Sequence, residues 1–334
     1  MRKIDFNCGY EELLAIAMMR NVSFEDRVRM AENGITFDQA QQMLGPSLAR
    51  LWERELEWCD DDVSEQVYRG HVFYGEEDYP DSLAACANPP FCLAWKGAKP
   101  SGCAGSFEHA ESVTIVGTRH SDLEGRRAAY LLALECAENG IAVYSGYATG
   151  IDQSSHSGAS DGGGRTFAVM PCGLAHSYAF RERGLAARIY ESGGGFISQF
   201  CCDEEPYKWN FHYRNRILAQ ISDVTVVVQA PRQSGALITA SDALDAGKDV
   251  FVHAAGSGPM LPREGTQGLV NDGAMTISCL ADLSQHTFNA FKCDSVIAEI
   301  SYDDIRDFLA SAAPGENVYR YADKYYRFVR RKRT

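Results

Sequence analysis

The sequence has little of what marks several large classes of protein. No apolar run in its 334 residues is long enough to span a bilayer, and the opening residues MRKIDFNCGYEELL contain no signal-peptide core. Its 11 cysteines form no CxxC pair, and histidine and cysteine do not cluster at metal-ligand spacing. We therefore expect a cytoplasmic protein with reduced thiols, no bound metal and no membrane partner.

Two glycine-rich nucleotide fingerprints are also missing. No G-x-G-x-x-G follows the first apolar strand, and no G-x-x-x-x-G-K-[ST] occurs in the chain. A dinucleotide-dependent dehydrogenase and a Walker-type nucleotide hydrolase are therefore both disfavoured. We expect no cofactor.

Positive charge is scarce. The chain has 32 Lys and Arg residues against 45 Asp and Glu, a net charge of −13, whereas nucleic-acid-binding domains are usually basic. Most of the imbalance lies in residues 1–112, which carry 10 basic and 20 acidic side chains. A local basic site further along the chain is compatible with this distribution.

The hydrophobic pattern divides the chain into three parts. Residues 1–70 have apolar side chains at three- and four-residue spacing, which predicts a small helical, SAM-like domain. Over residues 71–285, short apolar runs such as VTIVG and VTVVVQA alternate with helical patterns, which predicts an α/β fold with an extended Rossmann-like, doubly wound and mostly parallel sheet. Residues 286–334 are expected to be an irregular tail, basic at its end, in which no winged helix is recognised.

Unusual residues recur where the predicted strands end. VTIVG is followed by Thr118 and Arg119, IAVYSG by YATGID, and VTVVVQA by PRQSGALITA. Ligands of open parallel sheets bind outside the carboxyl ends of the strands, and glycine lets a phosphate approach a helix N-terminus closely. One such loop is also what any tight strand-to-helix turn needs, but several on one edge favour a ligand site.

The segment YKWNFHYRNRILAQIS, residues 207–222, interleaves basic and aromatic side chains. Basic groups neutralise phosphates while aromatic rings stack on exposed bases, which is typical of a site for a single nucleic-acid strand. The alternative interpretation is an amphipathic helix with a solvated charged face.

Asp152 and His156 are four residues apart and would share one face of a helix. Such a pair can act as a general base. No nucleophile completes a triad, so we interpret Asp152 as a cap that braces the helix start and His156 as a hydrogen-bonded structural residue. We expect no enzymatic activity.

Four motifs in this order resemble the DprA/Smf family of DNA-processing proteins. They are GTR (117–119), SGYATGIDQSSH (145–156), FHYRNRI (211–217) and SGALITA (234–240). The resemblance implies an extended Rossmann fold that binds single-stranded DNA, forms a homodimer and helps to load a RecA-type recombinase during uptake of transforming DNA.

The same resemblance assigns roles to particular residues. The residues expected to contact DNA are Arg119, Lys208, Phe211, Arg214 and Arg216. Those expected to shape a phosphate-binding pocket are Gly117, Thr118, Gly146, Gly150, Asp152, Asn215, Ser234 and Gly235. The chain departs from the family pattern at Gln199 and Gln229, where an acidic residue is usual, and at His212, where proline is common.

Two other functions stay open at this point. A nucleotide-derivative sensor or small nucleotide hydrolase would use the same strand-exit pocket, with Asp152 and His156 as catalytic candidates. A scaffold that has lost its affinity for DNA would account for the net charge of −13 and for Gln199 and Gln229.

Overall fold

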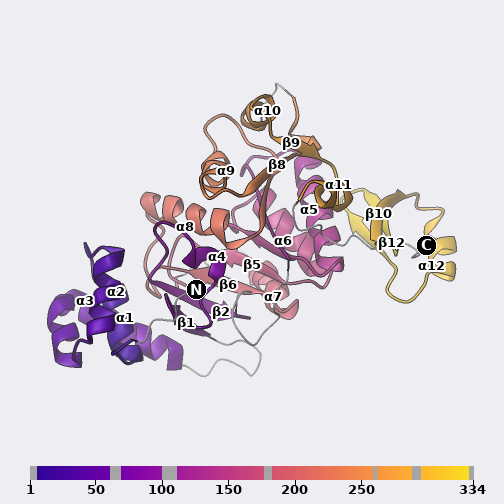
Figure 1. The fold of residues 1–334 in the computed structure, drawn as a ribbon. Coiled ribbons are helices and arrows are strands. Elements are labelled where there is room, and N and C mark those ends of the chain that lie inside the picture. Colours follow the sequence, from indigo (N-terminus) through magenta and orange to yellow (C-terminus); the bar gives the residue numbers. More distant parts are fainter. Residues whose placement is uncertain are drawn as a thin grey trace.

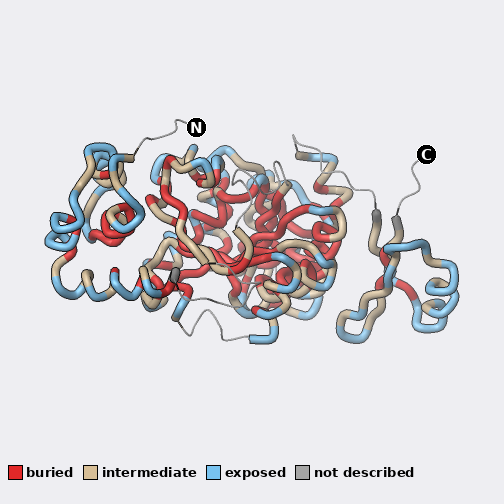
Figure 2. Tube along the Cα trace, turned by 90° about the horizontal axis from the view of Figure 1, so that it is seen from below, coloured by how far each residue is buried: buried red, intermediate tan, exposed pale blue. Residues whose placement is uncertain are grey.

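The fold is described from a computed structural model of the chain, which describes residues 6–60, 69–99, 111–176, 183–258, 262–287 and 295–330. A group of helices at the N-terminal end, a large central sheet and a small C-terminal sheet follow one another across the molecule (Figure 1). Most of the buried residues lie in the central part (Figure 2).

The N-terminal part is helical, with a core that extends onto the first strand of the central sheet. Its helices are α1 (Tyr10–Met18), α2 (Phe24–Asn33) and α3 (Phe37–Asp60), the last kinked at Gly45. Leu14, Ile16 and Trp52 are buried together with Phe73 of β1 (Arg69–Phe73). Because these helices share one apolar core with β1, they are packed against the sheet.

A chain of polar groups that starts at the exposed Tyr10 and ends inside the protein reinforces this junction. The hydroxyl of Tyr10 lies 2.7 Å from Nδ1 of His71, and Nε2 of the same ring lies 2.9 Å from Oε1 of Glu55. The other carboxylate oxygen of Glu55 accepts a hydrogen bond from the backbone N–H of Cys202. Two N-terminal helices, β1 and a loop of the central domain are therefore joined by hydrogen bonds.

The central sheet has nine strands in the order β1-β2-β6-β5-β4-β3-β7-β8-β9. After β1, the strands are β2 (Cys92–Gly97), β3 (Ser112–Val116), β4 (Ala142–Ser145), β5 (Thr166–Val169), β6 (Gly195–Ser198), β7 (Val224–Val227), β8 (Asp249–His253) and β9 (Met275–Ile277). The seven strands from β6 to β9 are parallel, while β1 and β2 form an antiparallel edge beside β6. The chain adds strands on one side of β3 and then returns to its other side with β7. The predicted doubly wound, mostly parallel sheet is confirmed.

Helices cover both faces of this sheet because its strands are apolar on both sides. Val113 and Ile115 of β3 face the helices α5 (Leu123–Glu138), α6 (Ile151–Asp161) and α11 (Leu280–His286). Val116 and Val227 face the opposite layer, which contains α4 (Asp81–Ala84), α8 (Lys208–Ile221) and α9 (Gly235–Asp245). The remaining helices of this part are α7 (Arg183–Glu191) and α10 (Glu264–Asn271).

The C-terminal part differs from the irregular tail expected from the sequence. It is a three-stranded antiparallel sheet in the order β10-β12-β11, with one helix in residues 295–330. Its elements are β10 (Ser295–Ile300), α12 (Ile305–Ser311), β11 (Asn317–Tyr321) and β12 (Lys324–Arg330). It packs on α5, where Arg127 pairs with Asp323 at 2.8 Å and the rings of Tyr130 and Tyr321 lie 4.6 Å apart.

Within the residues that the structure describes, no helix is long and apolar enough to cross a membrane. The same residues contain no disulfide bond. They also contain no group of three or more His, Cys, Asp or Glu side chains that could hold a metal ion.

Candidate functional site

A pocket of about 390 Å³ opens at the carboxyl ends of β3 and β7. These strands are neighbours although the chain reaches β7 only after building the other half of the sheet, which makes this edge the topological switch point where open α/β sheets bind ligands. Nine predicted site residues line the pocket: Gly117, Thr118, Arg119, Asp152, Phe211, Arg214, Asn215, Ser234 and Gly235. The other four are not among its lining residues: Gly146, Gly150, Lys208 and Arg216.

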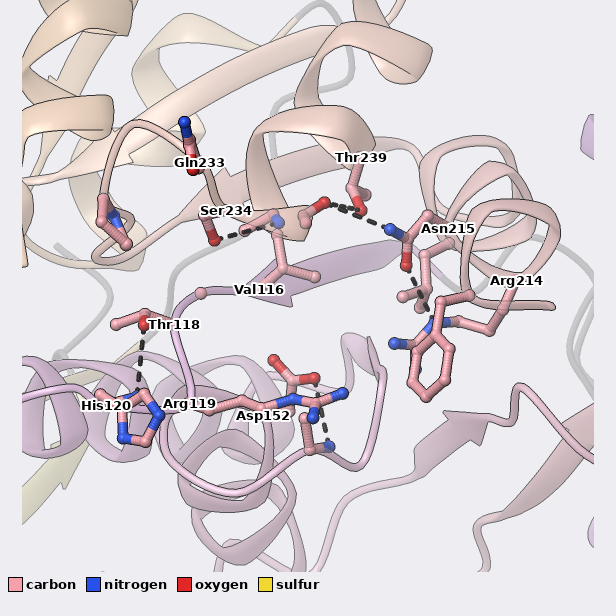
Figure 3. Close-up of a pocket in the computed structure, with 17 residues that line it drawn as sticks. Val116, Thr118, Arg119, His120, Asp152, Arg214, Asn215, Gln233, Ser234 and Thr239 are labelled. Carbon is pink, nitrogen blue, oxygen red and sulfur yellow. Dashed lines mark hydrogen bonds between the residues drawn. The ribbon is translucent and has the colours of Figure 1, made fainter. Parts of the chain in front are cut away.

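The turn after β3 forms the floor of the pocket and presents Arg119. The backbone N–H of Thr118 donates to the carbonyl oxygen of Gln229 at 2.7 Å, and the hydroxyl of Thr118 accepts a hydrogen bond from the N–H of His120 at 3.2 Å. Arg119 is exposed, and its side chain extends toward Asp152 (Figure 3). Its guanidinium carbon lies 5.4 Å from the centre of the Phe211 ring. The site therefore joins a cation and an aromatic ring at its opening.

Two glycines in the turn after β4 are required by close packing. Gly150 has φ +90°, and a Cβ atom there would lie 2.5 Å from the carbonyl oxygen of Thr118. A Cβ atom on Gly146 would lie 2.2 Å from Nη1 of Arg214. Neither residue lines the pocket, but both let the turns after β3 and β4 approach each other and the helix α8.

Arg214 is buried at the wall of the pocket. Its Nη1 donates to the carbonyl oxygen of Gly146 at 2.5 Å and to that of Val169 at 2.9 Å, and its Nε donates to Oδ1 of Asn215 at 3.0 Å. Arg214 therefore links α8 to the ends of β4 and β5. Its geometry indicates that it holds the pocket in shape in addition to bordering it.

The opposite wall is the start of α9. The hydroxyl of Ser234 caps this helix by accepting a hydrogen bond from the N–H of Ala236 at 3.3 Å. Nδ2 of Asn215 donates to the carbonyl oxygen of Gly235 at 3.2 Å, which joins α8 to α9 across the pocket (Figure 3). A helix N-terminus with exposed glycine is favourable for an anion because of its unpaired N–H groups.

Asp152 is a buried carboxylate at the floor of the pocket. It is the second residue of α6, whose N-cap is Gly150, and its Oδ2 accepts a hydrogen bond from the N–H of Ala148 at 3.3 Å. Burial raises the pKa of Asp152 to about 6, although the positive charge of Arg214 acts in the opposite direction. Asp152 is therefore not the helix cap expected from the sequence, because it lies inside the first turn. It braces the turn through Ala148, and its charge can change near neutral pH.

His156 lies outside the pocket lining and is completely buried. The hydroxyl of Thr166 donates to the carbonyl oxygen of Val143, so it must accept from Nδ1 of His156, which is 2.7 Å away. Burial lowers the pKa of His156 to about 3. Its position therefore agrees with a structural histidine and separates it from any ligand in the pocket.

Gln229, one of the departures from the family pattern, is a buried structural residue at the end of β7. Its Nε2 donates to Oδ1 of Asp122 and to the carbonyl oxygen of Ala255, both at 2.9 Å. Asp122 also pairs with Arg263 at 2.7 Å. A carboxylate could not make the two donations of Gln229, so the amide fits the partners that this chain provides.

The two faces of α8 separate the residues of the aromatic and basic segment. Phe211, Arg214 and Asn215 face the pocket. Arg216 is exposed on the other side, with its guanidinium carbon 5.9 Å from the centre of the Tyr213 ring, and Lys208 is exposed at the N-terminal end of the helix, outside the pocket lining. The helix therefore offers basic and aromatic groups on two sides.

The ends of α8 are held by side chains from outside the helix or from its first turn. Nδ2 of Asn210 donates to Oε1 of Glu204 at 2.9 Å and to the carbonyl oxygen of Glu205 at 3.1 Å. At the other end, the ammonium group of Lys248 donates to the carbonyl oxygens of Gln220 and Ser222. This helix is therefore fixed on the sheet.

Three polar residues that line the pocket were not among those expected from the sequence: His120, Gln233 and Thr239. His120 directly follows Arg119, and Gln233 directly precedes Ser234. Thr239 is four residues after Gly235 and so shares its face of α9. His120 and Gln233 could have been predicted from their adjacency to predicted site residues, and Thr239 from its helical spacing to Gly235.

Fold and site together define a Rossmann-like protein whose switch-point pocket combines arginines, an aromatic ring and a helix N-terminus, a set suited to phosphate-bearing ligands. A family model described as DNA recombination-mediator protein A matches residues 70–288. The chain belongs to this family, that of the DprA and Smf proteins.

Three comparisons illustrate the relationship. Protein Smf of Escherichia coli (strain K12) is 32% identical over 255 residues, 76% of this chain and 64% of that protein, so the chain spans less than two thirds of this relative. The X-ray structure of DNA processing protein A from Streptococcus pneumoniae matches with a TM-score of 0.64 and 22% identity, over 83% of this chain and 96% of that one.

The third comparison is a structure of DNA processing protein A from Helicobacter pylori, described by its single-stranded DNA binding mode. It matches with a TM-score of 0.55 and 25% identity, over 64% of this chain and 93% of that chain.

Proposed function

We propose that the chain is a single-stranded DNA-binding protein that protects incoming DNA and promotes loading of a RecA-type recombinase, acting in the cytoplasm as a homodimer and without enzymatic activity. The observation that carries the DNA-binding part is Arg119, exposed at the mouth of the switch-point pocket with its guanidinium carbon 5.4 Å from the Phe211 ring centre. A phosphate can bind the guanidinium while a neighbouring base stacks on the ring.

The proposal assigns the functions to the parts predicted from the sequence. Residues 71–285 hold the DNA site, residues 1–70 form a helical accessory domain, and residues 286–334 form a C-terminal extension. Within the described residues, Arg119 has no carboxylate within ion-pair distance. The charge of Arg119 also acts on the carboxylate of Asp152. Since no described carboxylate pairs with the guanidinium, a phosphate can still bind it. Recombinase loading and the homodimer are proposed from family membership.

The test is a titration of a labelled single-stranded oligonucleotide at low and moderate salt, with duplex DNA as the control ligand. The wild type should prefer the single strand and bind less tightly as salt rises, because phosphate contacts release counterions. Arg119→Ala should weaken binding and reduce the salt dependence by the equivalent of about one phosphate contact.

The matched control for this titration is Arg29→Ala. Arg29 is an exposed arginine on α2 that pairs with Asp26 of the same helix at 3.6 Å. The substitution removes the same charge far from the pocket, so it should leave affinity near the wild-type value. Absence of single-strand binding at low salt, or equal loss in both variants, would contradict the proposal.

The competing function is a nucleotide-derivative sensor or small nucleotide hydrolase. Its hydrolase form needs His156 near the ligand, and that side chain is completely buried and hydrogen-bonded to Thr166. A sensor would still bind nucleotides in the same pocket. Competition of mononucleotides with labelled DNA, together with an assay of their hydrolysis, separates the two functions.

A further inference from the structure

The outward side of α8 carries an uncovered row of aromatic rings. Trp209, Tyr213 and Arg216 are spaced four and three residues apart, so they form one stripe along the helix, which we call the outer stripe. Trp209 is 58% exposed and Tyr213 is 48% exposed. Trp209 and Tyr213 lie about one turn apart on this face, and an exposed apolar patch made by two large rings on one helix face marks a contact surface.

The outer stripe meets the start of the helix in a stacked pair of rings. Tyr207, the N-cap residue of α8, is 43% exposed, and its ring centre lies 4.8 Å from that of Trp209 with the ring planes 11° apart. Two parallel rings held in this way present a flat apolar face that is already arranged for stacking. Lys208, exposed between them in the sequence, adds a positive charge.

The surface is suited to a polyanion with planar groups. Helix α8 contains no acidic residue, in a chain with 45 of them. The positive charge of Arg216 acts on the carboxyl group of Asp242 in α9 and favours its charged form. The positive charge that this surface offers to a ligand is therefore mainly that of Lys208. Base stacking on the rings therefore contributes more than phosphate contact at this place.

The surface continues from the pocket. Phe211, which faces the pocket beside Arg119, is separated from Tyr207 by one helical turn. Phe211 and the outer stripe lie on opposite sides of α8, and Tyr207 and Lys208 at its N-terminus connect them. A strand that leaves the pocket past Phe211 can cross this end of the helix and reach Trp209.

We propose that single-stranded DNA extends from the pocket over the N-terminus of α8 and stacks its bases on Tyr207, Trp209 and Tyr213. This inference rests on the proposed function. It adds a second contact region, which only a strand longer than the pocket can reach. The contact depends on bases and not only on phosphates.

Tryptophan fluorescence offers a direct test. Trp52 and Trp58 are buried and Trp95 is half-buried in β2, so Trp209 is the exposed tryptophan of the chain. A base stacked on Trp209 should quench its emission. The full chain is titrated with thymidine oligonucleotides of about 5 and about 20 nucleotides, and with an abasic strand of the longer length.

The expected result is quenching by the long strand, little quenching by the short or abasic strand, and none of this signal in Trp209→Phe. Trp209→Ala should weaken binding of the long strand roughly 5- to 150-fold, the range for one base–aromatic stack, and leave the short strand unaffected. Trp209→Phe, which keeps a ring, should restore most of the affinity. Tyr302→Ala removes an aromatic ring that is 73% exposed in the C-terminal part and is the matched control.

The outcomes separate the inference from the proposed function. If the wild type does not bind single-stranded DNA, both are wrong. If binding is present and sensitive to Arg119→Ala, but Trp209→Ala binds the long strand as the wild type does, only the extended path is wrong. A change of oligomeric state in Trp209→Ala by light scattering, with DNA binding unchanged, would instead assign the outer stripe to a protein contact and overturn the inference.

Discussion

Nη1 of Arg214 donates hydrogen bonds to the carbonyl oxygens of Gly146, at 2.5 Å, and Val169, at 2.9 Å. One guanidinium therefore connects α8 with the loop that follows β4 and with the last residue of β5. The sequence motif suggested a residue that contacts DNA. The observed geometry adds a second role, because Arg214 positions the turn on which the pocket is built.

We expect Arg214→Ala to lower the free energy of unfolding by about 2–4 kcal/mol, because two buried carbonyl groups lose a charged donor. Arg119→Ala should change it by less than about 0.5 kcal/mol, since Arg119 is exposed. Urea unfolding of both variants measures the difference. Equal stability of the two variants would show that the Arg214 hydrogen bonds do not support the fold.

At position 229 the chain has glutamine where the family usually has an acidic residue, and restoring the acidic residue should destabilise this protein. Gln229→Glu would place a carboxylate against Asp122 and remove the donor to Ala255, so we expect a loss of about 3 kcal/mol in the free energy of unfolding at pH 7. Burial would raise the pKa of the new carboxyl group. Its destabilising effect is therefore present above that pKa and should shrink as the pH falls below it.

The matched control for Gln229→Glu is the double variant with Asp122→Asn. Asparagine still accepts the hydrogen bond of the α5 cap from Gly125 through Oδ1, the atom that faces position 229, and it removes the negative charge opposite the new carboxylate. Arg263, which loses its pair with Asp122, keeps its pair with Glu124. The double variant should therefore be more stable than Gln229→Glu alone. If the two are equally stable, the contact between positions 122 and 229 is not the cause of the loss.

The raised pKa of Asp152 predicts how the affinity for single-stranded DNA depends on pH. The pKa of Asp152 is raised to about 6 by burial, so the carboxylate is charged above that pH and repels a phosphate in the pocket. Affinity for single-stranded DNA should therefore rise as the pH falls from about 7.5 to 5.5, by roughly fivefold for ~1 kcal/mol of repulsion. Asp152→Asn should bind more tightly at the higher pH and lose most of this dependence.

His120 also lines the pocket and provides the control for this measurement. His120→Asn should leave the difference between the wild type and Asp152→Asn in place. An unchanged pH profile in Asp152→Asn would mean that the bound strand does not approach the floor of the pocket.

The lowered pKa of His156 predicts how the free energy of unfolding depends on pH. Burial lowers its pKa in the folded protein to about 3 from an ordinary value of 6.5, so between these values the unfolded chain binds a proton that the folded one does not. Stability is therefore lost as the pH falls below 6.5, by about 2 kcal/mol at pH 5. The variant His156→Asn keeps a donor for Thr166 but has no group that titrates in this range. Between pH 7 and 5 its free energy of unfolding should therefore fall by about 2 kcal/mol less than that of the wild type. His120 is exposed, so His120→Asn should show the same pH dependence as the wild type.

Much of the site could be predicted because the rules involved are local. An apolar run followed by glycine, or by Thr118 and Arg119, identifies a strand exit, and parallel strands place all such exits at one edge. The role of Gln229 could not be predicted in this way. Its partner Asp122 is 107 residues away, and only the folded chain shows which polar groups meet.

The two faces of α8 and the C-terminal sheet were missed for related reasons. Which residues of the segment 207–222 face the pocket depends on where the helix begins, and a shift of two residues would exchange the sides. In the C-terminal part, the pairing of β10 with β12 joins Ser295 to Arg330 across 35 positions. Such non-local pairing is not visible in the pattern of either strand alone.

Helix α8 is held at one end by Asn210 and at the other by Lys248, as the hydrogen bonds to Glu204, Gln220 and Ser222 show. The conformational entropy of this helix is therefore lost when the protein folds and not when a ligand arrives. A strand that binds along it meets side chains already in register, so the disorder removed on binding is mainly that of the nucleic acid. The spacing of the rings would then select strands flexible enough to adopt that spacing.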